Sequence, residues 1–226
     1  ILAVLPMAGG YNIHVMKAES PGPSVDKLVP KVSTTAKILY KIYFVMTIIQ
    51  IFLLLAGGMP LFDSLLHTFG TAGTGGFGIK NNSIAYYDSY YLQGVITVFM
   101  ILFGINFNAY YLILVGHVKE SFRLEEVRWY LIIILAATLL ITFDIRDGFG
   151  GLFPAFHHAA FQVASIITTT GFSTVDFNLW PEFSRFILVA LIFIGACAGS
   201  TGGGMRGSRI LLMAKNVKQG LVSMIH

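Results

Sequence analysis

Apolar residues along the chain are gathered into segments of two different lengths. Long apolar segments over 36–58, 90–116 and 129–143 predict helices that cross a bilayer, for which about 20 residues are usually needed. Two further segments, over 60–68 and 152–167, have the apolar spacing of a helix but are shorter. A helix of about twelve residues covers about 18 Å, a little over half of the hydrocarbon core. The pattern therefore predicts long spans alternating with helices that enter the membrane only part of the way.

Each short segment is followed by a turn rich in threonine and glycine, over 69–78 and 165–174. Superposing Gly76-Phe77 on Gly171-Phe172 gives an offset of 95 residues. Irregular backbone at membrane depth is tolerated only where protein buries it or where it lines a water-filled path. Carbonyl and hydroxyl oxygens in such a path replace the water shell of a cation. The alternative is a pair of buried turns between packed helices, which the duplication at matching positions disfavours.

The order of segments defines a repeated unit of span, half-length helix, turn and span. One unit occupies 34–118, and another occupies 127–226 and ends in a span interrupted by glycines over 195–204. Residues 1–33 are expected to hold the end of an earlier unit and a loop, and 119–126 to form a second, charged loop. The predicted fold is an all-α membrane protein made of repeated units, and the chain is expected to be part of a longer protein.

Composition supports a protein that crosses the membrane several times and contacts lipid. Hydrophobic residues make up 55% of the 226 residues, charged residues only 12%, and the mean hydropathy is +0.74. The single cysteine excludes a disulfide within the chain. The net charge of +4 does not indicate a nucleic-acid partner, because the basic residues are spread over loops rather than gathered on one soluble face.

The basic residues also predict an orientation. Twelve of the fifteen lysines and arginines fall in loops on one side of the predicted spans: Lys17, Lys27, Lys31, Lys37, Lys41, Lys119, Arg123, Arg128, Arg206, Arg209, Lys215 and Lys218. Only Lys80, Arg146 and Arg185 fall on the other side. Loops rich in lysine and arginine stay in the cytoplasm. Both threonine–glycine turns are therefore expected to open to the outside, which is the face by which each short helix must enter and leave.

The whole pattern resembles a known family. The strings Thr168-Thr-Thr-Gly-Phe-Ser-Thr174 and Gly195-Ala-Cys-Ala-Gly-Ser-Thr-Gly-Gly-Gly204, within fused potassium-channel-like units, resemble the Trk/Ktr/HKT superfamily of potassium transporters. The likeness is greatest to the membrane subunit of the bacterial Trk potassium uptake system. It implies that each unit consists of a span, a pore helix, a selectivity-filter loop and a second span. Four such units surround one pathway in that family, and this chain resembles the end of the first, the second and nearly all of the third.

The resemblance assigns residues to an ion-binding filter and to a gate. It implies that filter oxygens come from Thr74, Gly75, Gly76, Thr168, Thr169, Thr170 and Gly171, with potassium bound at Gly76, Thr170 and Gly171. It implies a gate in the glycine-interrupted span, made of Cys197, Gly199, Ser200, Thr201, Gly202, Gly203 and Gly204. The glycines alone predict a broken or pliable helix. They also fit close packing through small residues, since Gly195, Gly199 and Gly203 are spaced like a small-xxx-small motif.

The function that follows from the resemblance is potassium uptake across the bacterial inner membrane, by symport or by channel-like conduction. It implies a homodimer, a cytoplasmic nucleotide-binding regulatory subunit, no cofactor and no enzymatic activity. Two alternatives remain at this point. One is an intramembrane enzyme that uses His157 or His158 with Asp144, and the other is a structural membrane subunit whose glycines pack helices. The adjacent histidines point to different faces and do not form a metal pair, whereas Asp63 and His67 are spaced to pair locally.

Overall fold

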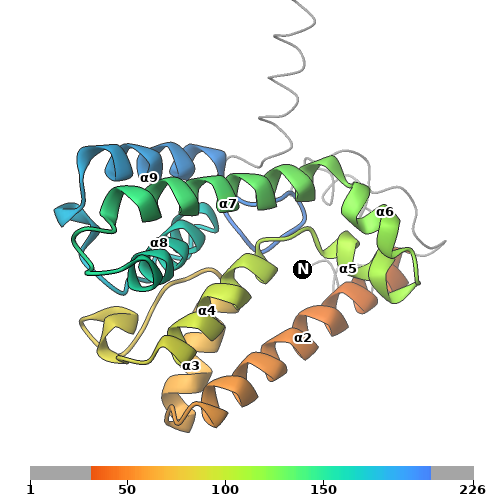
Figure 1. Ribbon diagram of the computed structural model, residues 1–226. Helices are drawn as coiled ribbons and strands as arrows, with labels where there is room; N and C mark the ends of the chain where they lie inside the picture. Colours follow the sequence, from red (N-terminus) through yellow and green to blue (C-terminus); the bar gives the residue numbers. More distant parts are fainter. Residues whose placement is uncertain (1–31, 205–226) are drawn as a thin grey trace, which may run out of the picture.

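The computed structural model describes residues 32–204, which fold into helices with no strand in that range. Figure 1 shows their arrangement. The elements are α2 (Val32–Ala56), α3 (Leu61–Ala72), η2 (Ser83–Tyr86), α4 (Tyr90–Phe103), α5 (Phe107–Leu114), α6 (Val118–Arg123), α7 (Glu125–Ile145), α8 (Leu152–Ile167), η3 (Phe177–Leu179) and α9 (Glu182–Ile194). The predicted end of an earlier unit and the last part of the third unit lie outside the described residues.

Two helices are long and apolar enough to cross a membrane, within α2 over Lys37–Ala56 and within α7 over Glu125–Ile145. Both coincide with predicted spans, although α7 begins earlier than the predicted residue 129. The charged segment before it, predicted as a loop over 119–126, contains most of the short helix α6 as well as the first two residues of α7. These acidic residues, Glu125 and Glu126, suit the positive end of the helix dipole.

The structure differs from the sequence prediction over 90–116, where it contains two helices instead of one span. Helices α4 and α5 are bent by 90° relative to each other. The side chain of Asn106 accepts a hydrogen bond from Asn108 N at 2.9 Å and thereby caps the start of α5. Gly104 lies so close to α7 that a Cβ atom there would collide with the Tyr130 hydroxyl. The bend therefore depends on a local cap and on a tertiary contact, and hydropathy reports neither.

The two short helices end at equivalent places. Helix α8 has the predicted bounds, and α3 continues beyond the predicted residue 68 to Ala72. Ala72 and Ile167, the last residues of the two helices, are related by the same 95-residue offset as Gly76 and Gly171. Both helices carry a proline at or near the start, Pro60 before α3 and Pro154 in the first turn of α8, where a missing N–H costs nothing.

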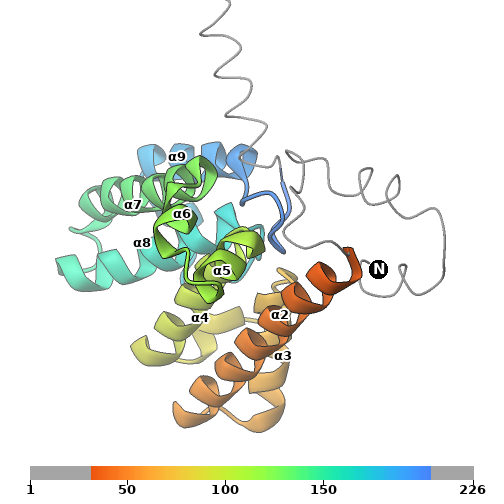
Figure 2. The ribbon, with the colours of Figure 1, turned by 90° about the vertical axis from the view of Figure 1, so that its right-hand side faces the viewer.

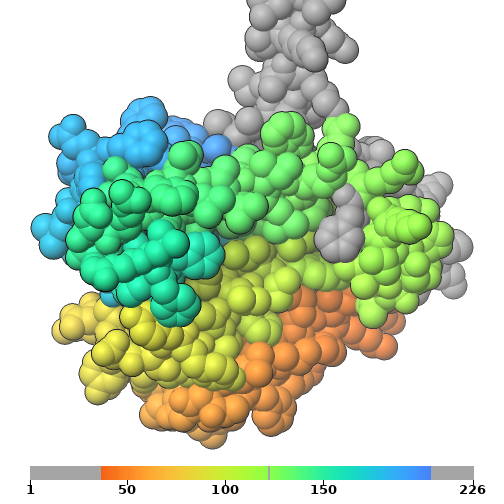
Figure 3. All heavy atoms as spheres, viewed as in Figure 1, coloured from red at the N-terminus to blue at the C-terminus, as the bar shows by residue number. Residues whose placement is uncertain are grey.

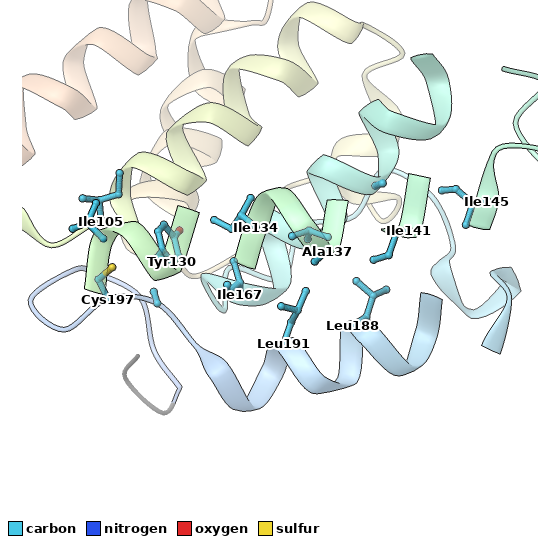
Figure 4. Packing of buried hydrophobic residues seen from close by; sticks show 14 of the residues in the cluster. Ile105, Tyr130, Ile134, Ala137, Ile141, Ile145, Ile167, Leu188, Leu191 and Cys197 are labelled. Atoms are coloured by element: carbon cyan, nitrogen blue, oxygen red, sulfur yellow. The ribbon is translucent and has the colours of Figure 1, made fainter. Parts of the chain in front are cut away.

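The third unit packs around its own short helix and against the second unit. The apolar faces of α7, α8 and α9 meet in one cluster that includes Ile134, Ala137 and Leu191 (Figure 4). The opposite side of α8 contacts α4, where Phe161 and Phe172 join a second cluster of fully or nearly fully buried side chains. Figure 2 shows α8 between the two groups of helices, and Figure 3 shows their atoms forming one continuous body. The turns that follow α3 and α8 are thus positioned by a shared interior.

A half-buried carboxylate joins α7 to the start of α9. Pro181 stands at the N-cap of α9, where no side chain of the helix accepts a hydrogen bond. Asp144 Oδ2, near the end of α7, instead accepts hydrogen bonds from Ser184 N at 3.2 Å and from Ser184 Oγ at 2.6 Å. Ser184 is fully buried. Asp144 of α7 therefore provides the hydrogen-bond acceptor that a backbone N–H in the first turn of α9 would otherwise lack.

We expect Asp144→Ala to destabilise the protein by about 1–3 kcal/mol, because a buried amide and a buried hydroxyl lose their acceptor. The measurement is the thermal unfolding midpoint in detergent, where a decrease of several degrees is expected. Asp147→Ala is the matched control, because that side chain is 92% exposed and only approaches Arg146 at 3.5 Å. Equal midpoints for the two variants would contradict the role given to Asp144.

Candidate functional site

The turns after α3 and α8 share one backbone conformation. Thr74 and Gly76 have positive φ angles of 49° and 65°, and Thr169 and Gly171 have φ angles of 58° and 88°. Each pair is related by the 95-residue offset. A threonine in the left-handed region is uncommon and costs about 1–3 kcal/mol, so it persists only where surrounding contacts impose it. The repeat seen in the sequence is therefore also a repeat of backbone angles.

The hydrogen bonds of the two turns match as well. The two amides that precede Phe77 donate to Gly70 O at 2.8 and 3.3 Å, and the two that precede Phe172 donate to Ser165 O at 2.9 and 3.3 Å. These bonds turn the N–H groups back toward the end of each short helix. Among the described residues, no hydrogen bond to the carbonyl oxygens of 74–76 or 169–171 is found. Both turns thus keep backbone oxygens available for another electropositive partner.

The two turns lie against each other at Gly76. A Cβ atom on Gly76 would collide with the carbonyl group of Thr170, whereas one on Gly171 would meet nothing within 4 Å. Both short helices also direct their C-terminal ends at this place, and the C-terminus is the negative end of the helix dipole. Carbonyl oxygens and helix ends together favour a cation without any charged side chain in the turns.

Helix α3 of the second unit supports the turn of the third. The ring of Phe172 is fully buried and stacks on His67 with ring centroids 5.7 Å apart. His67 Nδ1 is 2.7 Å from the backbone carbonyl of Asp63, so the predicted pairing of these residues does not use the Asp63 carboxylate. That carboxylate accepts a hydrogen bond from the Tyr87 hydroxyl. Burial, followed by the effect of Asp63, raises the pKa of Tyr87 and keeps the hydroxyl a donor.

The predicted gate segment is an irregular loop. Helix α9 ends at Ile194, and residues 195–204 have no helical structure; we call them the glycine-rich loop. The helical small-xxx-small packing considered for Gly195, Gly199 and Gly203 is therefore absent from this segment. Three of its glycines have positive φ angles, 65° at Gly195, 72° at Gly199 and 80° at Gly204.

The glycine-rich loop contacts both turns through threonine hydroxyls at equivalent positions. Thr74 Oγ1 donates a hydrogen bond to Thr201 O at 3.0 Å, and Thr169 Oγ1 accepts one from Gly203 N at 2.9 Å. The structure thus brings Thr74 and Thr169, both predicted in the filter, together with Thr201 and Gly203. Cys197, also predicted in the gate, is instead buried in the core cluster beside Ile105 and Tyr130 (Figure 4).

The glycine-rich loop also fills the break between α4 and α5. Bending the second span there frees backbone groups at 103–107, and the loop supplies their partners. The bonds run from Cys197 N to Gly104 O at 3.1 Å, from Phe107 N to Gly199 O at 3.1 Å, and from Thr201 N and Oγ1 to Phe103 O at 3.3 and 3.2 Å. In Figure 1 the loop passes from the end of α9 toward the α4–α5 junction. Each irregular segment therefore supplies hydrogen-bond partners to the backbone groups of the other. Such partners are required at membrane depth, because no water is present there to replace them.

Sequence reasoning missed one side chain at this place. Glu126, in the first turn of α7, accepts a hydrogen bond from Ala198 N at 2.6 Å through Oε1. It belongs to the segment 119–126 that the sequence predicts as a charged loop. An acidic residue in a first helical turn is so common that its type and position give no signal of this contact.

The polar residues considered for an intramembrane enzyme each contact a different partner. His157 Nε2 lies 2.8 Å from Gln93 Oε1, and His158 Nδ1 lies 3.0 Å from Thr174 Oγ1. Asp144 is bound by Ser184. Within 32–204 there is no group of three side chains able to hold a metal ion. These contacts support packing within the third unit and, through His157 and Gln93, between the two units rather than a catalytic arrangement.

Repeated units of this kind, with a half-length helix that presents free backbone oxygens, define the class of cation-conducting membrane proteins with pore loops. Residues 2–225 match the family model TrkH, described as a cation transport protein. The chain belongs to this family, which is a family of transport proteins and not of enzymes.

Relatives of known name agree with this placement. The chain is 35% identical over 231 residues to the Trk system potassium uptake protein TrkH of Salmonella typhimurium and to that of Escherichia coli, covering 100% of this chain and 47% of each relative. It is 32% identical over 228 residues to the Trk system potassium uptake protein TrkG of Escherichia coli. The crystal structure of the potassium transporter TrkH from Vibrio parahaemolyticus matches with a TM-score of 0.84 and 31% identity, over 100% of this chain and 47% of that one. The chain spans about half the length of the curated relatives it matches.

Proposed function

We propose that the chain supplies two of the units around a potassium uptake pathway, and that the two matched turns are its selectivity filter. The observation that carries the proposal is the pair of contacting turns in which the backbone oxygens of 74–76 and 169–171 accept no hydrogen bond from the described residues. The names of the relatives, all potassium uptake proteins, support potassium as the transported ion. The proposed ligands are the oxygens of Thr74, Gly75, Gly76, Thr168, Thr169, Thr170 and Gly171, with potassium held at Gly76, Thr170 and Gly171.

The chemistry of the proposed filter is replacement of water by backbone oxygens. Removing the water shell of a cation without a substitute would cost on the order of tens of kcal/mol in a low-dielectric medium. Carbonyl groups held by the bonds to Gly70 and Ser165 are fixed before the ion arrives, so little reorganisation is needed when it binds. The remaining units, which a longer protein would contribute, complete the circle of ligands.

The glycine-rich loop is the proposed gate. Its hydrogen bonds to Thr74 and Thr169 place it against both turns, so that an ion leaving them meets the loop. The proposed gate residues are Cys197, Gly199, Ser200, Thr201, Gly202, Gly203 and Gly204, with Cys197 anchoring the loop in the core rather than lining the path. Opening then means that the loop leaves the threonine hydroxyls.

The proposed setting is the bacterial inner membrane, with the turns facing outside, as the distribution of lysine and arginine predicts. Exposed apolar side chains on α2, α7 and α9, such as Phe52, Leu135 and Phe186, suit contact with lipid or with the remaining units. The proposed assembly is a homodimer with a cytoplasmic nucleotide-binding regulatory subunit. Potassium is the substrate, and the proposal includes no cofactor.

We expect liposomes that contain the full-length protein to take up rubidium-86, with block by potassium and not by lithium. Gly171→Asp should abolish that uptake, because an aspartate at φ 88° is strained and brings a charged carboxylate into the filter. Gly150→Asp is the matched control, because Gly150 has φ 66° and open space around it but lies in the loop before α8.

Uptake that is blocked equally by lithium would contradict a potassium-selective filter. Equal loss in the Gly171 and Gly150 variants would assign the effect to backbone strain and remove Gly171 from the filter. Absence of rubidium uptake in the unaltered protein, with its cytoplasmic partner present, would overturn the proposed function.

A further inference from the structure

The glycine-rich loop has one hydrogen bond that differs in kind from the rest. Ala198 N donates to the Glu126 carboxylate at 2.6 Å. The loop's other hydrogen bonds to described residues join neutral groups. A hydrogen bond to an ionised carboxylate is shorter and roughly twice as strong as a neutral one. Among the described residues, Glu126 therefore makes the strongest single hydrogen bond to the loop.

The position of this hydrogen bond would allow Glu126 to hold the glycine-rich loop reversibly. Ala198 immediately precedes Gly199, whose φ of 72° marks a change of chain direction. The loop is held on one side by the filter threonines and on the other by Glu126 and the α4–α5 break. Glu126 is only half-buried, so water can replace Ala198 N as a partner of the carboxylate. The carbonyls of Phe103 and Gly104 belong to fully or nearly fully buried residues and have no such substitute nearby.

We propose that Glu126 is a positioning residue that fixes the closed position of the glycine-rich loop through its bond to Ala198 N, so that losing this bond favours the open path. The proposal rests on the proposed function of the loop as a gate. Glu126 does not touch the ion; it acts on flux through the loop. The anchor lies on α7, so a movement of that helix end would be transmitted to the loop.

The single cysteine of the chain supplies a direct readout. Cys197 is 2% exposed and precedes Ala198, so release of the loop should expose its thiol. The experiment uses the full-length protein, with any cysteine outside residues 1–226 replaced by serine. The probe is a cationic methanethiosulfonate reagent, and Cys197→Ser establishes the background rate.

We expect Glu126→Ala to accelerate modification of Cys197 by about tenfold, as loss of one charge-assisted hydrogen bond would do. The maximal rate of rubidium uptake should increase several-fold while the potassium concentration for half-maximal competition stays unchanged. Glu126→Gln should restore values within about threefold of the unaltered protein, because its amide oxygen still accepts a hydrogen bond. Glu120→Ala is the control, since Glu120 is exposed and pairs with His117 at 2.9 Å.

Unchanged modification of Cys197 in Glu126→Ala would overturn the proposal, and so would equal acceleration in the alanine, glutamine and Glu120 variants. A lower unfolding temperature without faster modification would reduce Glu126 to a structural role and also overturn it. Thiol modification requires no ion flux. If Glu126→Ala exposes Cys197 but no variant takes up rubidium, the anchor stands and the proposed function fails, so the two failures are distinguishable.

Discussion

Replacing Gly76 with alanine should reduce rubidium uptake by the full-length protein by about a hundredfold or more. The φ angle of 65° places residue 76 in the left-handed region, which costs a residue with a Cβ about 1–2 kcal/mol. The added atom would also collide with the carbonyl of Thr170, a proposed ligand from the other unit. Each 1.36 kcal/mol of lost stabilisation lowers the rate tenfold. The backbone strain and the displaced ligand together are expected to cost more than twice that free energy, which corresponds to a loss of about a hundredfold or more.

Gly75→Ala is the matched control for this prediction. A Cβ atom on Gly75 would lie 3.2 Å from the ring of Phe77, an exposed side chain that is free to turn away. Uptake should remain within about threefold of the unaltered protein, because the backbone carbonyl of residue 75 is kept. If the two variants lost uptake equally, the close approach of the turns at Gly76 would have no functional role.

Replacing Gly202, Gly203 and Gly204 together with alanine should increase the uptake rate by about tenfold. A Cβ atom on Gly203 would lie 2.9 Å from Thr169 Oγ1, and one on Gly204 would lie 3.3 Å from Gly195 Cα. The φ of 80° at Gly204 adds strain to the closed position. The loop then leaves the filter threonines more often. The measurement is the initial rate of rubidium uptake, with potassium, sodium and lithium as competitors.

Selectivity should be unchanged in the triple variant, since the turns themselves are intact. Gly94→Ala is the control, because an added Cβ in α4 would meet nothing within 4 Å. Unchanged uptake in the triple variant would favour a purely structural role for these glycines. Lower uptake with altered selectivity would show that the loop shapes the filter instead of closing it.

The sequence predicts those elements whose ends are set by residues next to them in the chain. Helix α8 has its predicted bounds because its apolar run begins directly after a glycine pair and ends at a threonine run. The matched turns are also predictable, since they follow from one offset that relates Gly76 to Gly171. Their common conformation, with Thr74 and Thr169 at positive φ, agrees with that repeat.

Features that depend on distant partners escape sequence reasoning. The segment 90–116 is predominantly apolar, so hydropathy predicts one span, and the break at 104–106 exists because α7 and the glycine-rich loop meet it. The anchoring role of Glu126 escapes for the same reason, since its partner Ala198 lies far along the chain. The contacts of the loop with Thr74 and Thr169 likewise form only once the helices have packed together.

The hydrogen bonds shared by the α4–α5 break and the glycine-rich loop have a consequence for how the protein enters the membrane. Residues 103–107 are synthesised well before the loop at 195–204, which supplies their partners. An unpaired backbone group in hydrocarbon costs several kcal/mol. The second unit therefore cannot insert stably into lipid by itself. Its backbone groups at 103–107 must stay in contact with water or with the insertion machinery until the third unit is inserted. The two units therefore complete their insertion into the membrane together.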